Sequence, residues 1–247
     1  MWRLAFLLYA SVAAAQPPAA PPSGRPEPPP PLWTGSAGAG FSMNRGNTDT
    51  TNLNLSFEAT RDPKTRSVWK FKSLYLHGET DGALAVDRFL LDARNERALT
   101  ERVYAFAAVQ VLEDEFKAID YLWAPSGGLG YKLIATPTTS LNADAGLGVK
   151  FEKNPGADRR TDAVVTFSDK LEHKLSKTAS ITQAFGALWK AQDFGDALYT
   201  FTAGTAAALT TRTQIKLELL DSYAARPPTP DVKSNDVALL TAFVYKF

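Results

Sequence analysis

The chain has 247 residues, 45% of them hydrophobic, and a formal net charge of +1. It contains no cysteine, which excludes a disulfide framework and a lipidated cysteine. The sequence has no basic stretch of the kind that binds nucleic acid. The mean hydropathy of −0.19 is ordinary for a soluble protein. It also suits a transmembrane β-barrel, because half of each strand in such a barrel faces a polar lumen.

The first 31 residues predict a leader and a linker. Met1-Trp2-Arg3 carries one positive charge, residues 4–15 are apolar, and Ala13-Ala14-Ala15 offers an A-x-A cleavage site. This run is too short to cross a bilayer as a helix. Residues 16–31 are mostly Pro and Ala, which favours an extended periplasmic spacer or a tether for a partner there. We therefore expect a signal peptide at 1–15, a linker at 16–31 and a folded domain at 32–247.

From residue 32 onward, apolar and polar residues alternate in one short segment after another. Leu53, Leu55 and Phe57, for example, are separated by single polar residues. Alternate side chains of a β-strand face opposite sides of the sheet, and no sustained helical period appears. The expected strands lie at 33–44, 52–59, 69–75, 88–96, 103–112, 121–133, 141–151, 160–174, 181–189, 199–209, 215–219 and 237–247.

The number of strands and their connections predict an all-β fold. About twelve strands is an even number, as in closed single-chain barrels of the bacterial outer membrane. Tight turns are expected at 61–65, 100–102, 135–139, 175–177 and 210–212, and longer loops at 78–86, 113–120, 152–159, 192–196 and 224–234, with a short exception at 45–48. Short periplasmic turns and longer outer loops are typical of such barrels. We therefore expect a closed antiparallel transmembrane β-barrel with both termini in the periplasm.

The aromatic residues form two groups near the expected strand ends. Such belts are typical of the two membrane interfaces, whereas a soluble β-sandwich would hold most of the rings in mid-strand core positions. The periplasmic group contains Trp33, Trp69, Tyr131, Tyr245 and Phe247, and the outer group contains Phe41, Tyr75, Phe89, Tyr121, Trp123, Phe151, Trp189, Tyr199 and Tyr223.

The final strand carries a signal of its own. Phe243, Tyr245 and Phe247 alternate up to the terminal residue, and this ending resembles the terminal signature of bacterial outer-membrane barrels. The resemblance implies insertion by the barrel-assembly machinery, with outer-membrane lipid and lipopolysaccharide as surroundings.

Two expected strands depart from the alternation. In strand 103–112, Tyr104 and Phe106 lie opposite the other apolar residues, which requires either an apolar patch inside the lumen or a bulge. In strand 160–174, Asp169 falls on the apolar face. Because a bare carboxylate facing lipid is costly, we expect a bulge near residues 166–169.

Several short motifs resemble one family. They are Leu32-Trp33-Thr34-Gly35, Gly40-Phe41-Ser42, Gly46-Asn47-Thr48-Asp49-Thr50, Gly127-Gly128-Leu129-Gly130-Tyr131 and Val244-Tyr245-Lys246-Phe247. Their order and spacing resemble the YdiY-like family of salt-induced outer-membrane proteins, a domain of unknown function. The resemblance implies an outer-membrane barrel linked to salt or envelope stress, and it supplies no catalytic residues.

The charged residues on the polar face are the main indication of function. Neighbouring expected strands bring together a lumen cluster of Glu58, Lys70, Lys72, Arg88, Asp92, Arg94 and Glu96. The same face carries Asp144, Lys150, Asp162, Lys170, Lys190, Lys216 and Glu218. One interpretation is a selectivity region for small ions or anionic solutes. The other is a network of paired charges that fills a narrow lumen.

Two expected outer loops carry carboxylates. Glu79 and Asp81 lie in one loop with Asp87, and Glu113, Asp114 and Glu115 lie in another. Divalent cations prefer oxygen ligands, so these loops could bridge Ca²⁺ or Mg²⁺ to lipopolysaccharide phosphates. The alternative is solvated loop charge. The first interpretation would make the protein a structural barrel with an occluded lumen.

An enzyme is the rival class of function. Outer-membrane lipid hydrolases need a Ser–His pair, and this chain has two histidines, His77 and His173. His77 is expected on the lipid face with Ser73 as the nearest serine, and His173 near a periplasmic turn. No phosphate loop or metal-ligand cluster is evident. We therefore expect no catalysis, no cofactor, no metal and no nucleic acid. The sequence favours a narrow pore or an envelope-stress barrel in the outer membrane.

Overall fold

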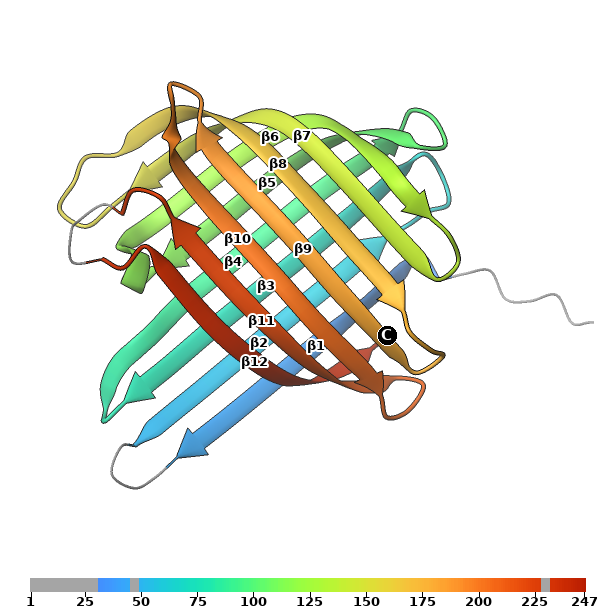
Figure 1. Cartoon of the computed structure of the whole chain (residues 1–247), viewed down its shortest axis with the longest axis horizontal. Coiled ribbons are helices and arrows are strands. Elements are labelled where there is room, and N and C mark those ends of the chain that lie inside the picture. Colours follow the sequence, from blue (N-terminus) through green and yellow to red (C-terminus); the bar gives the residue numbers. More distant parts are fainter. Residues whose placement is uncertain (1–30, 45–48, 228–231) are drawn as a thin grey trace, which may run out of the picture. The chain divides into compact units, whose positions relative to one another are not determined.

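The computed structural model describes residues 31–44, 49–227 and 232–247, and in them twelve antiparallel strands form a closed barrel (Figure 1). Each strand pairs with its chain neighbours, and β12 closes on β1. The strands are β1 (Trp33–Asn44), β2 (Thr50–Arg61), β3 (Ser67–Thr80), β4 (Ala83–Ala98), β5 (Val103–Asp114), β6 (Ile119–Ala135), β7 (Thr139–Lys153), β8 (Arg160–Lys174), β9 (Ala179–Lys190), β10 (Asp193–Ala208), β11 (Thr213–Ala224) and β12 (Asn235–Lys246).

The expected all-β closed barrel is confirmed, and the bounds of β1 and β8 coincide with those predicted. The predicted signal peptide and all of the linker except Pro31 lie outside the described residues, as do Gly46, Asn47 and Thr48 of the family motif. Among the described residues, no helix is long and apolar enough to span a membrane. We call the rim where β1 begins and β12 ends the chain-end rim, and the opposite rim the far rim.

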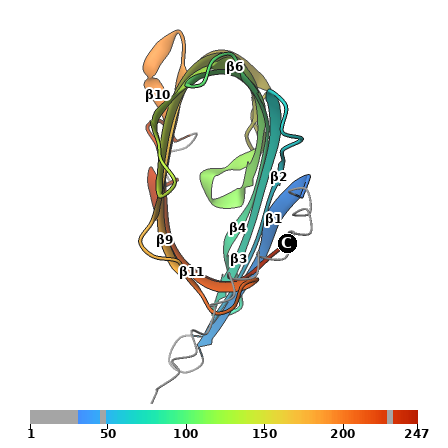
Figure 2. The same ribbon diagram turned by 90° about the vertical axis from the view of Figure 1, so that its right-hand side faces the viewer.

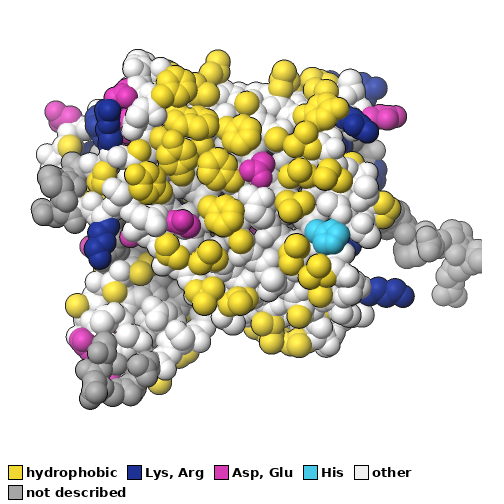
Figure 3. Space-filling view, viewed as in Figure 1, with side chains coloured by type: hydrophobic (Ala, Val, Ile, Leu, Met, Phe, Trp, Pro, Cys, Tyr) yellow, Lys and Arg dark blue, Asp and Glu magenta, His cyan; other side chains and the backbone are white. Residues whose placement is uncertain are grey.

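Register pairs divide each strand into an inward and an outward face. Glu58 pairs with Lys72, and Lys72 pairs with Asp92, so these charges share the inner face of three adjacent strands. On the outer face, Leu147 is 69% exposed and Leu239 is 68% exposed, whereas the inward Leu122 is 1% exposed. Figure 3 shows hydrophobic side chains spread over the outer surface of the strands. The barrel therefore has an apolar exterior and a lumen with polar zones.

The two strands with irregular patterns prove to be regular. Tyr104 and Phe106 are buried on the inner face of β5, whose pairing with β6 is continuous from Val103 to Leu112. The apolar patch is therefore the correct alternative there. The pairing of β7 with β8 is continuous along the whole strand, so the predicted bulge near residues 166–169 is wrong. Asp169 lies on the outer face opposite Ala143 and Phe185.

Two of the expected long connections at the far rim are tight turns. β3 and β4 continue into the predicted loop 78–86 and meet at Asp81 and Gly82, whose φ angles are 52° and 75°. Positive φ at both central residues is the hairpin geometry that an Asp-Gly pair favours. β9 and β10 likewise meet at residues 191–192, inside or beside the predicted loop 192–196. The length of a connection therefore does not show by itself at which rim of the barrel it lies.

Candidate functional site

The candidate site is the barrel interior, which has three zones from the chain-end rim to the far rim. A vestibule of charged side chains comes first. A leucine layer follows, and an ionic cap lies beneath the far rim. On β4 the inward side chains pass through all three in order: Glu96, Arg94 and Asp92 in the vestibule, Leu90 in the layer and Arg88 in the cap.

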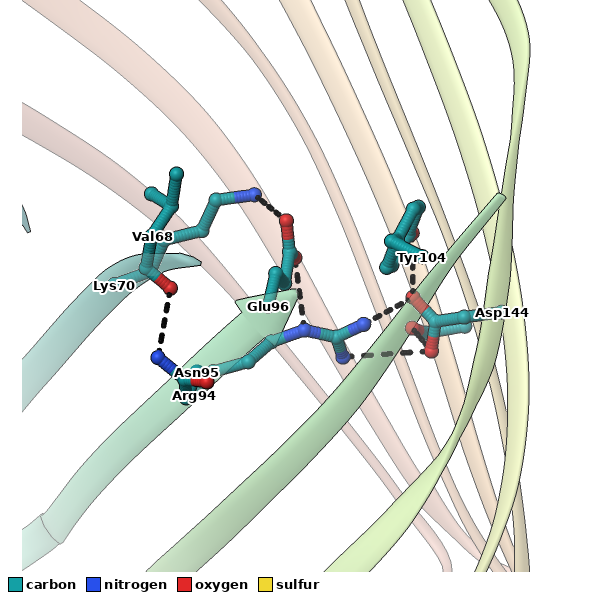
Figure 4. A network of polar contacts seen from close by, with 8 residues as sticks. Val68, Lys70, Arg94, Asn95, Glu96, Tyr104 and Asp144 are labelled. Atoms are coloured by element: carbon teal, nitrogen blue, oxygen red, sulfur yellow. Dashed lines mark hydrogen bonds and ion pairs between the residues drawn. The ribbon is translucent and has the colours of Figure 1, made fainter. Parts of the chain in front are cut away.

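The vestibule contains an ion-pair network that crosses part of the lumen (Figure 4). Lys70 Nζ on β3 lies 2.6 Å from Glu96 Oε2 on β4, and Arg94 Nε donates to Glu96 Oε1 at 2.9 Å. Arg94 also reaches Asp144 on β7, where Nη2 lies 2.7 Å from Oδ2. The Arg94 guanidinium carbon lies 3.9 Å from the centre of the Phe106 ring. Stacking of a guanidinium on an aromatic ring is favourable, so Phe106 supports this bridge.

Asp144 is held by several donors. Besides Arg94, it accepts hydrogen bonds from Ser168 Oγ at 2.9 Å and from Tyr104 Oη at 3.3 Å. These donors come from β4, β5 and β8, so one carboxylate on β7 ties four strands together. A carboxylate that accepts hydrogen bonds from several sides is fixed in place. The inward Tyr104, which the alternation treated as an anomaly, is therefore a member of the network.

A second group of charges spans the lumen at a similar depth. The Glu58 carboxylate on β2 interacts electrostatically with the ammonium groups of Lys72, Lys170 and Lys216. Lys170 comes from β8, on the opposite wall, and Lys216 from β11, three strands away from β2 around the ring. Lys216 Nζ is also 2.6 Å from Glu218 Oε2. Because Glu58 and Lys170 lie on opposite walls and still interact, the oval ring of strands that Figure 2 shows is narrow across this level.

The leucine layer is the apolar zone of the lumen beyond the vestibule. Inward leucines and other apolar side chains form two packed clusters, and Leu90 packs against both. The first cluster contains Leu112, Ile119, Leu122, Ala124, Val164 and Leu188, with Leu198 against it. The second contains Leu74, Leu76 and Leu220, with Ala238 and Leu240 against it. Such an apolar zone repels water and ions, as hydrophobic gates in channels do.

The ionic cap is built around a connection that folds inward. The 3-10 helix η1 (Glu115–Lys117) joins β5 to β6, and Figure 2 shows this segment inside the ring of strands. The Asp114 carboxylate caps it by accepting from Lys117 N at 3.1 Å, and Arg88 Nη1 lies 3.6 Å from Asp114 Oδ2. Ala118 ends the helix in the left-handed conformation, which turns the chain back toward β6.

Lys117 fastens this connection to the opposite wall. Its side chain is 2% exposed. The ammonium group meets three carbonyl oxygens and one carboxylate: Ser222 O at 3.3 Å, Lys233 O at 3.3 Å, Ser234 O at 2.8 Å and Asp236 Oδ2 at 3.0 Å. A buried ammonium needs such partners, since burial without them is very costly.

Further pairs complete the cap. Lys150 Nζ lies 2.7 Å from Glu152 Oε2 on the same strand, and Asn154 Nδ2 donates to the Ala118 carbonyl at 2.7 Å. Asp162 and Lys190 pair at 2.8 Å between β8 and β9. The connection after β7 is therefore bonded to the inward-folded connection after β5.

The predicted lumen cluster is divided between two zones. Lys70, Arg94 and Glu96 meet in the vestibule network, and Asp92 interacts there with Arg94 and Lys72. Glu58 joins the second vestibule group, as described above. Arg88 belongs to the cap, with the leucine layer between it and the others. Sequence reasoning missed Lys117, Tyr104 and the leucines. The leucines had a visible signal, because they occupy inward positions of strands whose outward positions are also apolar.

The predicted cation loops do not form ligand sets. Glu113 lies on the outer face of β5, paired with Phe89, whereas Asp114 faces inward to Arg88. Adjacent residues of a strand face opposite sides, so these carboxylates cannot share an ion. Asp81 accepts a hydrogen bond from Asp49 N at 2.8 Å in the β3–β4 turn. Within the described ranges, no three His, Asp or Glu side chains are placed to hold a metal ion.

Neither histidine has a serine partner in the described barrel. His77 is paired with Leu53 and Asp87 and stacks on Tyr75. The Nε2 atom of His77 lies 3.6 Å from the carboxylate of Glu79, which is one of the carboxylates of the predicted cation loop. His173 Nδ1 lies 2.8 Å from Thr139 Oγ1. The expected geometry of a lipid hydrolase is therefore not formed at His77 or His173.

The terminal and family-motif residues meet at the chain-end rim. Phe247 exchanges two backbone hydrogen bonds with Gly35, and its ring stacks on Phe57. A Cβ at Gly35 would lie 2.6 Å from that ring, which explains why the motif needs glycine there. Trp33 stacks on Phe71. Phe243 and Tyr245 point outward, 53% and 43% exposed.

A solved outer-membrane channel shares the fold. A COG4313 outer membrane channel from Pseudomonas putida F1 aligns over 87% of this chain and 95% of its own, at 13% identity and a TM-score of 0.53. A NanC porin aligns over 87% of this chain and 96% of its own, at 10% identity and a TM-score of 0.47. At 13% identity, the likeness to the COG4313 channel concerns the fold alone. No curated protein matches the chain.

A family model covers nearly all of the barrel. Residues 37–247 match the model described as "Protein of unknown function, DUF481". The YdiY-like family that the motifs resemble is this same family, so that prediction is confirmed. The chain belongs to the DUF481 family of proteins of unknown function.

Proposed function

We propose that this chain is a non-enzymatic barrel of the bacterial outer membrane, whose narrow lumen passes ions and small solutes only when the leucine layer opens. The observation that carries this proposal is the apolar layer between two charged zones of one lumen. A barrel built only for support needs no polar vestibule, and a permanently open pore needs no apolar barrier. The combination is typical of a gated conduit.

The outer surface supports a membrane location. Near the chain-end rim, Trp69 stacks on Phe71, and near the far rim Trp123 stacks on Phe151. These groups match the two aromatic belts that barrels place at the membrane interfaces. With the leader at 1–15 removed on export, the chain-end rim faces the periplasm. A pore that is shut at rest also suits the response to salt or envelope stress that the family resemblance implies.

Single-channel recording of residues 16–247 in a planar bilayer tests the proposal. We expect long silent periods with brief, small openings, because the resting layer excludes water. During openings under a KCl gradient, the reversal potential should stay close to zero, since vestibule cations such as Lys70 and Lys216 are matched by Glu96 and Glu218. Steady large steps would contradict the gate, and a strong preference for anions would contradict the charge balance.

Asp169→Leu tests the membrane location by itself. We expect the variant to resist unfolding in lipid vesicles better than the native barrel, because a charge on the lipid face is unfavourable. The expected gain in stability is below about 2–4 kcal/mol, which is the cost of a lipid-facing Lys or Arg at mid-membrane, because Asp and Glu cost less. Asp162→Leu, on the inner face of the same strand, is the matched control and should destabilise the barrel, since it leaves Lys190 without its partner. Equal losses in both variants would argue against a lipid-facing Asp169.

A further inference from the structure

The barrel closes at a short seam. β1 and β12 are paired at four positions, from Ser36 with Lys246 to Ala39 with Phe243, and the Gly35–Phe247 backbone bonds extend this contact at the chain-end rim. By contrast, β1 is paired with β2 along its whole length, and β12 with β11 along almost all of its own. Within the described parts of the chain, residues 40–44 and 235–242 therefore each have one edge without a strand partner. Figure 1 shows β1 and β12 diverging toward the far rim.

A side chain marks the point where the pairing stops. Asn54 Nδ2, from β2, reaches across β1 and donates to the Thr241 carbonyl of β12 at 3.3 Å. It passes over Gly40, where an added Cβ would lie 1.9 Å from the Thr241 oxygen and 2.4 Å from the Asn54 nitrogen. The Asn54 amide thus takes the place of the next bond between the strands. The divergence begins directly beyond it.

The start of β12 is held away from β1 by the cap. Lys117 bonds to the Ser234 carbonyl and the Asp236 carboxylate, which ties this end of the strand to the connection folded into the lumen. Among the described residues, no side chain of β1 or β2 takes part in the contacts of this cap that are given above. The buried lysine therefore favours an open seam at the far rim.

The outer face of the open seam is apolar, and so is the β12 side of its inner face. Its outer lips are Phe41, Met43, Val237 and Leu239, which are 66%, 56%, 60% and 68% exposed and continue the apolar exterior. On the inner face, Ala238 and Leu240 of β12 pack with the second leucine cluster. The β1 side is polar, and its Ser42 Oγ accepts from Asn52 Nδ2 at 3.4 Å. The strand edges themselves carry backbone N–H and C=O groups, which cannot be left without partners in a hydrocarbon environment.

We propose that this seam is a lateral portal that admits a lipid acyl chain from the membrane to the leucine layer. An amphipathic lipid suits both features of the seam. Its chain packs on the leucines, and the oxygens of its head group accept hydrogen bonds from the N–H groups of the exposed edges. The portal rests on the membrane location in the proposed function, but not on ion conduction.

The chain contains no cysteine, so single cysteines labelled with bimane report on lipid contact without background. The reporters are Leu240→Cys at the inner seam, Leu188→Cys in the leucine layer on the other wall, and the outward Leu239→Cys. The barrels are placed in phosphatidylcholine vesicles with brominated acyl chains, which quench bimane on contact. We expect quenching at Leu240 nearly as strong as at Leu239, with Leu188 protected. Protection at Leu240 equal to that at Leu188 overturns the portal.

Controls separate this result from other failures. Heat-dependent mobility on gels shows that each variant is folded, and Leu76→Cys replaces Leu240→Cys if the latter does not fold. Lack of quenching at the outward Leu239 would refute the membrane location itself. A barrel that shows no channel openings but strong quenching at Leu240 would contradict the proposed pore and support the portal.

A pair of cysteines measures whether the seam is open. If the register of Ala39 with Phe243 continued, Met43 would pair with Leu239. Met43→Cys/Leu239→Cys should oxidise about tenfold more slowly than Ala39→Cys/Phe243→Cys, because a disulfide needs closely spaced Cα atoms. Equal rates for the two pairs would mean that the strands stay closed, and would overturn the portal.

Discussion

Lys117→Met releases the connection between β5 and β6 from the opposite wall and lowers the free energy of unfolding by about 1–3 kcal/mol, the usual cost of leaving buried hydrogen-bond acceptors without their donor. The variant keeps the length of the side chain and removes the charge. Three carbonyls and the Asp236 carboxylate then lose the ammonium group that they share. Unfolding in urea, followed by heat-dependent gel mobility, measures the loss.

The same variant should change conduction. A connection that is no longer fastened can leave the lumen, so we expect more frequent openings in single-channel records. Lys233→Met is the matched control, because the Lys233 side chain is exposed and only its backbone carbonyl takes part in the cap. If Lys117→Met were as stable and as silent as Lys233→Met, the cap would be neither a support nor a restraint on the pore.

The sequence predicts the wall of the barrel well, because the wall follows from local rules. A period of two places Glu58, Lys72 and Asp92 on the inner face, and the register pairs place them there as well. The errors have local causes too. The Asp81-Gly82 pair is a strong hairpin signal. It lies inside the segment 78–86, for which the strand pattern predicts a long loop. The cost of a carboxylate facing lipid predicts a bulge near Asp169, yet the strand is regular.

The interior is predicted less well, because its contacts join strands that are distant in the chain. Arg94 meets Asp144 across two intervening strands, and Lys117 meets Ser234 across the lumen. Alternation says that such residues point inward, and it says nothing about which residues they meet. Those partners depend on how the ring of strands is flattened. The alternation of apolar and polar residues along strands also gives no indication that η1 folds into the lumen.

The leucine layer was within reach of the sequence. On β3, Leu74 and Leu76 continue the inward series of Lys70 and Lys72, so the inner face changes from charged to apolar along one strand. The same change recurs on β4 and β11, at Leu90 and Leu220. Only the packing of these leucines against one another required the structure, which brings them together in two clusters joined at Leu90.

Leu90→Ser should make the barrel conduct. Leu90 packs against both apolar clusters, so a hydroxyl at this position brings water to the joint between them and lowers the barrier to ions. Because Leu90 is only partly buried, the stability cost should fall below the about 2–5 kcal/mol of a fully buried Leu→Ala change, and the variant should fold. We expect a large rise in open probability in single-channel records.

Leu91→Ser is the matched control. Leu91 is the next residue on β4 and faces outward, paired with Ser73 and Val111, so this change alters the exterior and leaves the lumen apolar. The two variants add the same hydroxyl on either side of one strand. If both barrels fold and remain equally silent, the leucine layer is not what closes the lumen, and the cap becomes the barrier. If only Leu90→Ser conducts, the layer is the gate.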